Sequence, residues 1–188
     1  SGPTNWVSSA DIAPRSASGV HDGPMDLHPN LTDVAGLLGR WGGTGQGEYP
    51  TIEPFTYADA WEFTSSGKPF VGFVQRTRSE QGVPMHTESG YLRFPSPGVV
   101  EIVAALPMGQ VEIGTGTVAV DGSTLVIRTE ASVHVTPSAK RVDRIVRTFT
   151  LTGNQLALTL AMDAVGVGMT HHLSSRLGRE GDVPPVVD

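Results

Sequence analysis

Turn sequences recur at short intervals through most of this 188-residue chain, and they constrain the fold more than any other feature. They contain glycine or proline, and in the order of the chain they are Gly67-Lys68-Pro69, Gln81-Gly82, Pro95-Ser96-Pro97-Gly98, Pro107-Met108-Gly109, Asp121-Gly122, Gly153-Asn154 and Gly166-Val167-Gly168. Asp-Gly between alternating runs is among the strongest short-range signals for a β-hairpin. The spacing therefore predicts many short strands joined by tight turns.

The runs between these turns alternate apolar with polar or small residues, as half-buried strands do. Residues 124–135 and 155–164 show this period of two most clearly. Counting such runs predicts an all-β fold of about ten antiparallel strands in up-and-down order. Closure into a barrel would pair both edge strands, and a barrel of about ten strands is too wide for side chains alone to fill. We therefore expect a closed β-barrel with a ligand cavity.

The chain divides into three parts by composition. Residues 1–30 are rich in Ser, Pro, Gly and Asp without a period, which predicts a flexible arm. Residues 31–180 form the barrel domain, and residues 181–188 form a C-terminal tail. A short helix is expected over residues 31–39, because apolar residues stand at positions 31, 34, 37 and 38 and a glycine follows them.

Five glycines surround one tryptophan, Trp41, at the start of the first long strand. They are Gly39, Gly42, Gly43, Gly45 and Gly47. Glycine at such density marks bends, bulges or close approach of other groups, and a barrel strand has to bend and coil to close. We expect Trp41 to plug the bottom of the barrel.

Charge and composition exclude several classes of partner. The formal net charge is −6 and the pI is near 5.4, which argues against binding to nucleic acid or to an anionic membrane surface. In residues 139–147 the basic residues alternate with apolar ones, so we interpret this stretch as a solvated strand face. There is no cysteine, which excludes disulfides and thiolate sites. Neither a membrane-spanning run nor a secretory signal is evident, and a cytoplasmic location is the expectation.

Familiar catalytic motifs are missing from the sequence. Serine-hydrolase, zinc-protease and P-loop patterns do not occur, and the G-x-G-x-x-A at residues 114–119 lies within a strand pattern, so we attribute it to chance. Asp59 and Glu62 are close enough in sequence to suggest an acid–base pair. We interpret both as solvated surface carboxylates.

The histidines offer better candidates. His21 and His28 belong to the expected arm, His134 lies on the polar face of its strand, and His86 can face either way at a strand end. His171 and His172 follow a glycine-rich turn and open the last strand; neighbouring strand residues point to opposite faces, so at most one enters the barrel. One histidine makes a poor zinc site, which needs three or four protein ligands, but it suffices for the iron of a haem.

Several segments in order resemble the nitrobindin family. Its G-x-W-x-G-x-G motif matches Gly39, Trp41, Gly43 and Gly45, and the first residues of lipocalins and fatty-acid-binding proteins share only the G-x-W part. The other matching segments are GEYPTIEPFTY (47–57), GKPF (67–70), QRTR (75–78), PMHTESGYLR (84–93), TPSAK (136–140) and HHLSSRLGR (171–179). The resemblance covers residues 35–178 and is closest to the mycobacterial members.

This resemblance implies a ten-stranded, lipocalin-like barrel that binds one haem b per subunit near its mouth. The family's proximal histidine precedes a leucine, which matches His172 before Leu173 and makes His172 the implied iron ligand and catalytic centre. A pocket threonine of the family corresponds to Thr51. A lysine corresponds to Lys140, where it would meet a haem propionate.

The strand pattern leaves the choice between the two histidines open. His171 shares a face with Leu173 and Leu177, whereas His172 shares one with Ser174 and Arg176. A bend at the turn of residues 166–168 would reset this phase, and we follow the family motif to His172.

By resemblance, the chain is an enzyme that isomerises peroxynitrite to nitrate at ferric haem and also binds nitric oxide. Two other functions stay open: a barrel that carries fatty acids or other apolar molecules, and a haem-based sensor or carrier of nitric oxide without turnover. The expected partners are small molecules, with no nucleic acid or membrane, and the sequence leaves a homodimer open.

Overall fold

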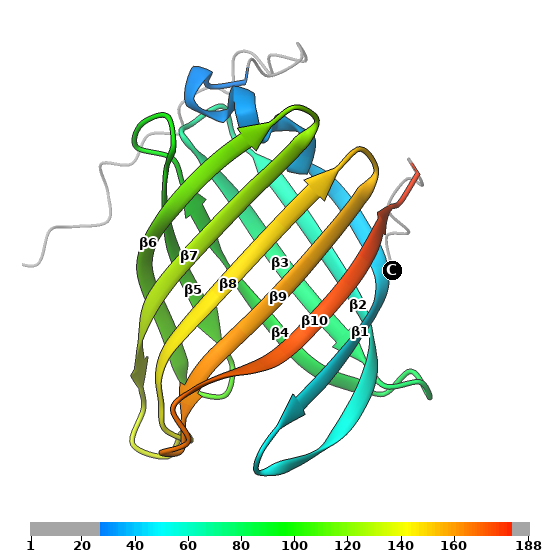
Figure 1. Ribbon diagram of the computed structural model, residues 1–188, viewed down its shortest axis with the longest axis vertical. Coiled ribbons are helices and arrows are strands. Elements are labelled where there is room, and N and C mark those ends of the chain that lie inside the picture. Colours follow the sequence, from blue (N-terminus) through cyan, green and yellow to red (C-terminus); the bar gives the residue numbers. More distant parts are fainter. Residues whose placement is uncertain (1–26, 182–188) are drawn as a thin grey trace, which may run out of the picture.

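Ten antiparallel strands form a closed barrel, as the turn spacing predicts. The computed structural model describes residues 27–181. Within these residues one helix, η1 (Pro29–Leu37), is followed by β1 (Gly39–Tyr49), β2 (Ile52–Ser65), β3 (Phe70–Arg78), β4 (Pro84–Arg93), β5 (Val99–Leu106), β6 (Gln110–Asp121), β7 (Thr124–Val135), β8 (Val142–Thr152), β9 (Gln155–Ala164) and β10 (Met169–Arg179). Each strand pairs with the next, and β1 pairs with β10 to close the barrel (Figure 1).

The up-and-down order places alternate connections at opposite ends of the barrel. The β1–β2, β3–β4, β5–β6, β7–β8 and β9–β10 connections lie at one end, which we call the mouth. The other connections lie at the end where η1 sits (Figure 1). Eight turn glycines have a positive φ, a conformation that glycine adopts without steric cost; they are Gly67, Gly82, Gly98, Gly109, Gly122, Gly153, Gly166 and Gly168.

The end opposite the mouth is closed by η1 and Trp41. The Trp41 side chain is fully buried, and its Nε1–H donates a 2.8 Å hydrogen bond to the carbonyl oxygen of Leu37. The guanidinium of Arg179 lies 4.3 Å from the centre of the indole. The prediction that Trp41 plugs the barrel is confirmed. The helix itself is a 3-10 helix that begins two residues before position 31.

The glycines of β1 make room for aromatic rings from β2. A Cβ atom at Gly45 would collide with the ring of Tyr57, and one at Gly47 would collide with the ring of Phe55. Both rings therefore pack closely against β1 on the inside of the barrel, where a larger residue would push them away. The glycine cluster is needed for close approach as well as for strand curvature.

Most of the apolar core lies near the closed end. Trp61 stacks on Phe63, with 5.4 Å between ring centres, and Phe149 meets both rings edge-on. A smaller cluster of Tyr49, Val142, Ile145 and Ala164 lies at the mouth. Because the large side chains fill only the closed end, a cavity is left toward the mouth.

The predicted arm and tail fall almost entirely outside the described residues. Of the few arm residues that are described, Leu27 packs against the core and Pro29 begins the helix, so the packed structure starts before position 31. The division of the chain into three parts stays a prediction. No helix in residues 27–181 has the length and apolar character needed to cross a membrane.

Candidate functional site

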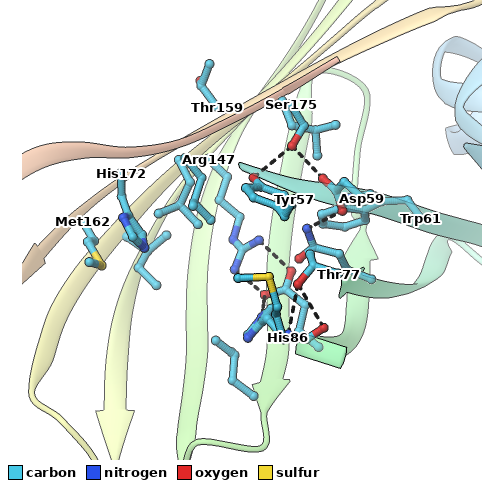
Figure 2. Close-up of a pocket in the computed structure, with 18 of the residues that line it drawn as sticks. Tyr57, Asp59, Trp61, Thr77, His86, Arg147, Thr159, Met162, His172 and Ser175 are labelled. Carbon is cyan, nitrogen blue, oxygen red and sulfur yellow. Dashed lines mark hydrogen bonds and ion pairs between the residues drawn. The ribbon is translucent and has the colours of Figure 1, made fainter. Parts of the chain in front are cut away.

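The site is a cavity of about 260 Å³ at the mouth end of the barrel. Apolar side chains such as Phe55, Ile145 and Met162 line it. Figure 2 shows Met162 together with several of the polar groups on the cavity wall. A largely apolar pocket with a few convergent polar groups is the usual form of a cofactor or ligand site.

His172 lines this cavity and is held in one tautomer. Its Nδ1 lies 3.0 Å from the carbonyl oxygen of Glu48. A carbonyl only accepts hydrogen bonds, so Nδ1 carries the proton and Nε2 keeps its lone pair. Burial lowers the pKa of His172 below its ordinary value, which favours the neutral imidazole. A neutral ring with its far nitrogen fixed by a backbone carbonyl is the form in which histidine ligates metals.

A bulge in β10 decides which histidine enters the barrel. His171 pairs with Ala161 of β9 and Leu173 with Leu160, so His172 is the extra residue between them. The bulge resets the alternation, and His172, Leu173 and Ser175 all line the cavity. His171 is exposed and faces a separate surface hollow. The phase change expected at residues 166–168 thus occurs instead at His172 itself.

Tyr49 fixes the surroundings of His172. Its ring meets the imidazole edge-on, with 5.5 Å between ring centres. Its hydroxyl lies 3.2 Å from the carbonyl oxygen of Ala164 and accepts a 3.2 Å hydrogen bond from the Ala164 N–H. The regular pairing of β1 with β10 ends at Gly47, so this hydroxyl joins the end of β1 to β9 where the strand ladder no longer does.

Replacing Tyr49 by phenylalanine is expected to weaken haem binding about 10-fold, the lower end of what loss of an outer partner of a metal ligand costs. The ring contact with His172 would stay, whereas the hydrogen bonds between the Tyr49 hydroxyl and Ala164, which hold the end of β1 and so Glu48 in place, would be lost. Hemin titration followed by absorbance measures the effect. Tyr91→Phe, on the exposed outer face of β4, is the matched control and should bind as the wild type does.

Asp59 is buried, contrary to the interpretation as a surface carboxylate. It is 2% exposed and lines the cavity, because residues 57, 59, 61 and 63 form the inward face of β2. Glu62 lies on the outward face, where it pairs with Arg40 at 3.3 Å. The two carboxylates are three residues apart in a strand, so they point to opposite sides. The interpretation is wrong for Asp59 and correct for Glu62.

Asp59 is the inner end of a hydrogen-bonded chain. Its Oδ2 accepts a 2.7 Å bond from the hydroxyl of Ser175, which lies 3.0 Å from the hydroxyl of Tyr57. Its Oδ1 accepts a 2.8 Å bond from Gln75. Burial raises the pKa of Asp59 against the opposing effect of these hydrogen bonds. Figure 2 shows the chain on one wall of the cavity.

A second buried cluster joins one arginine to two glutamates. Arg147 donates from Nη1 and Nη2 to the two oxygens of Glu88 at 2.6 and 2.8 Å. Its Nε donates to Glu112 at 2.9 Å, and Nη2 also reaches Glu112. All three residues are at most 5% exposed. Four donor contacts of the guanidinium are thus taken up by carboxylates.

The cluster has one basic group and two acidic groups, and their environments shift the pKa values of the two acids in opposite directions. Burial raises the pKa of Glu88, but the opposing effect of Arg147 and of nearby His86 is larger and holds it at about 2. For Glu112 burial is the larger effect, and its pKa is raised. Glu88 is therefore ionised at neutral pH, where it pairs with Arg147.

The expectation that residues 139–147 form a solvated face is wrong for Arg147. A register shift between Val142 and Arg144 changes the alternation in β8, so that Ile145, Arg147 and Phe149 all point inward. Lys140, Arg141 and Arg144 are on the outside, as expected. This shift cannot be detected in the sequence, because no glycine or proline marks it.

The remaining candidate residues from the sequence are Thr51, Lys140, His86 and His134, and of these only His86 lines the cavity. Thr51 is exposed in the β1–β2 turn and Lys140 precedes β8, both at the mouth, but neither lines the cavity. His86 is half-buried in the cavity wall, 3.4 Å from Glu88, and His134 lies away from the cavity, as expected. A haem-contact role for Thr51 and Lys140 stays a prediction.

The donor set suits a haem better than a bare metal ion. Among residues 27–181, no group of three or more His, Cys, Asp or Glu side chains is arranged to hold a metal ion. One imidazole nitrogen with a free lone pair, surrounded by apolar side chains, is what a porphyrin-bound iron requires. The residues present therefore fit a haem held through one histidine.

Comparisons with known proteins show the family of this barrel. A family model described as a THAP4-like, heme-binding beta-barrel domain matches residues 30–179. Peroxynitrite isomerase 2 of Mycobacterium marinum is 46% identical over 159 residues, covering 84% of this chain and 99% of that protein. Peroxynitrite isomerase 1 of Mycobacterium tuberculosis is 41% identical over 160 residues, with coverages of 82% and 98%.

A solved structure from the same genus as these relatives has a similar fold. The crystal structure of Rv2717c from M. tuberculosis superimposes with a TM-score of 0.81 at 40% sequence identity, covering 83% of this chain and all of that one. The family model spans the whole barrel, from η1 to β10. The chain belongs to the THAP4-like family of heme-binding β-barrel domains, and its cofactor is haem.

Proposed function

We propose that this chain isomerises peroxynitrite to nitrate at a ferric haem that His172 would hold. The observation that carries the proposal is the hydrogen bond from His172 Nδ1 to the Glu48 carbonyl, which leaves Nε2 free at the cavity. The names of relatives that match over 98–99% of their own length support the reaction.

The bound haem would supply an iron centre with one coordination position open to a small ligand. The protein holds the imidazole neutral and oriented through Glu48, and the ring of Phe55 lies 6.3 Å from it on the same wall. The barrel wall keeps bulk water from the enclosed side of the site, where charges act more strongly. These are the contributions of the chain itself to the reaction.

Carriage of fatty acids fits the cavity less well. A fatty-acid carboxylate needs a free cation inside the barrel, yet the guanidinium of Arg147 is already engaged by both Glu88 and Glu112. Asp59 adds a further acidic group on the wall. A buried anion without a free counter-charge is strongly disfavoured.

Nitric oxide is expected to bind at the same open position, since it is small and needs no charged partner. A sensor or carrier without turnover would have the same cavity, so kinetics must separate it from the isomerase. A cytoplasmic location and a homodimer also stay predictions.

The test is reconstitution of the purified chain with hemin, followed by rapid mixing with peroxynitrite. We expect a Soret band of histidine-ligated ferric haem, and a decay of peroxynitrite that is accelerated in proportion to haem-loaded protein with nitrate as product. Apo protein at equal concentration is the control. Haem binding without acceleration would favour the nitric oxide carrier, and no specific Soret band would contradict both haem functions.

A further inference from the structure

The proposed reaction raises a question of proton balance. Peroxynitrite and its conjugate acid interconvert, and nitrate is the anion of a strong acid. Isomerising the anion releases no proton, whereas isomerising peroxynitrous acid to nitrate releases one. A site that also consumes the acid form needs a group to take that proton.

The structure assigns this role to Asp59, Ser175 and Tyr57: we propose that they form a relay that carries a proton from a ligand in the cavity to the Asp59 carboxylate. The inference rests on the proposed function, since it concerns the ligand of the haem that His172 would hold. Asp59 is available for this role because it is buried and lines the cavity, in contrast to the surface position that its sequence suggests.

The hydrogen bonds among these three side chains all run in the same direction, from Tyr57 through Ser175 to Asp59. Ionised Asp59 only accepts, so the single hydroxyl proton of Ser175 is directed to Oδ2. The Ser175 oxygen then accepts from the hydroxyl of Tyr57, 3.0 Å away. This leaves a lone pair on the Tyr57 oxygen as the outer end of the chain, on a residue that lines the cavity.

The proton transfer balances without any other reactant. A proton from the acidic ligand goes to the Tyr57 oxygen, the Tyr57 proton goes to Ser175, and the Ser175 proton goes to Asp59 Oδ2. Each hydroxyl loses one proton and gains one, so only the ligand and the carboxylate change charge. Burial raises the pKa of Tyr57 to about 12, so its hydroxyl passes the proton on without forming a stable phenolate.

The neighbouring groups favour Asp59 as the acceptor. Burial raises the pKa of Asp59, and the carboxylate of Glu88 on β4 raises it further. Glu88 itself is held ionised by Arg147 on β8, which also engages Glu112 on β6, and His86 lies beside Glu88. From β3 the neutral Gln75 donates to Asp59 and holds it in place. The groups that contact Asp59 are thus neutral donors, and the cation nearby is engaged by the two glutamates.

Cyanide is the probe that isolates this step. At neutral pH it is mostly hydrogen cyanide, which has to lose its proton when the anion binds ferric haem. Nitric oxide binds without a proton change and reports on access and haem geometry alone. Both association rates are measured by stopped-flow on the haem-loaded chain.

We expect Asp59→Asn, Ser175→Ala and Tyr57→Phe each to slow cyanide association on the order of 10²-fold, the range of general acid–base catalysis. Nitric oxide association should not change. In Asp59→Asn the new amide can donate to Ser175 and keep the chain intact in the reverse direction, so this variant removes the proton acceptor with little loss of structure. The double variant Asp59→Asn/Ser175→Ala should be no slower than either single one, because both interrupt the same path.

Each variant has a matched control outside the cavity. These controls are Glu62→Gln on the outer face of β2, Ser174→Ala beside Ser175, and Tyr91→Phe on β4, and all should retain the wild-type cyanide rate. Equal slowing of both ligands would show a structural effect and overturn the relay, as would a cyanide rate indifferent to all three relay variants. Failure of the wild-type chain to form a histidine-ligated haem complex would instead overturn the proposed function.

Discussion

His172→Ala is expected to lower the affinity for hemin by more than about 100-fold, because loss of even an outer partner of a metal ligand costs roughly 10–100-fold. The variant loses the imidazole that the bulge in β10 turns into the cavity beside Glu48. Its Soret band should be that of non-specifically bound haem. Hemin titration by absorbance measures both the affinity and the spectrum.

His171→Ala is the matched control, since the residue is adjacent in sequence but exposed on the outside of the barrel. It should bind hemin as the wild type does. Loss of the band in His171→Ala with retention in His172→Ala would reverse the assignment of the ligand. Added imidazole should partly restore the spectrum of His172→Ala, because the cavity left by the side chain can accept it.

Arg147→Met is expected to destabilise the fold by about 3–5 kcal/mol at neutral pH, the range for removing one partner of a buried ion pair. Methionine fills much of the space of the arginine but leaves two buried carboxylates without a cation. Chemical denaturation at pH 7 measures the free energy of unfolding. Arg141→Met, in a surface ion pair with Asp143, is the control and should leave the denaturation midpoint unchanged.

The loss in Arg147→Met should shrink as the pH falls. In the wild type the pKa of Glu88 is about 2, below its ordinary 4.5, so its pairing with Arg147 stabilises the fold above pH 4.5 and is lost as the pH falls toward 2. In the variant, burial alone would raise the pKa of both acids. Their protonation then relieves the charge, and the gap between the two proteins narrows on acidification. A gap that stays constant from about pH 7 to about pH 4 would contradict this account.

The barrel itself could be predicted from local sequence signals. Turn glycines, Asp-Gly and alternating runs act between near neighbours in the chain, and in an up-and-down meander near neighbours are also the pairing partners. The glycine cluster at the start of the first long strand likewise predicts that Trp41 plugs one end of the barrel. Because so much of this topology is local, the strand count and the order of pairing followed from the sequence.

The site could be predicted only in part. The pair His171 and His172 stands out among the histidines, but strand alternation leaves the choice between them open, and only the family motif points to His172. The sequence pattern predicts a surface position for both Asp59 and Arg147, whereas the structure buries them. The residues next to Asp59 in the sequence do not indicate that it is buried, and a charged residue in a strand is usually exposed.

What the sequence determined by itself is the closed antiparallel barrel, its plugged end and the presence of histidine near the mouth. What only the tertiary structure decided is the direction of individual side chains there. Register shifts in β8 and β10, on either side of β9, turn Arg147 and His172 inward. A one-residue shift moves a side chain to the other face of a sheet, and such a shift is set by pairing between strands rather than by the residues of one strand.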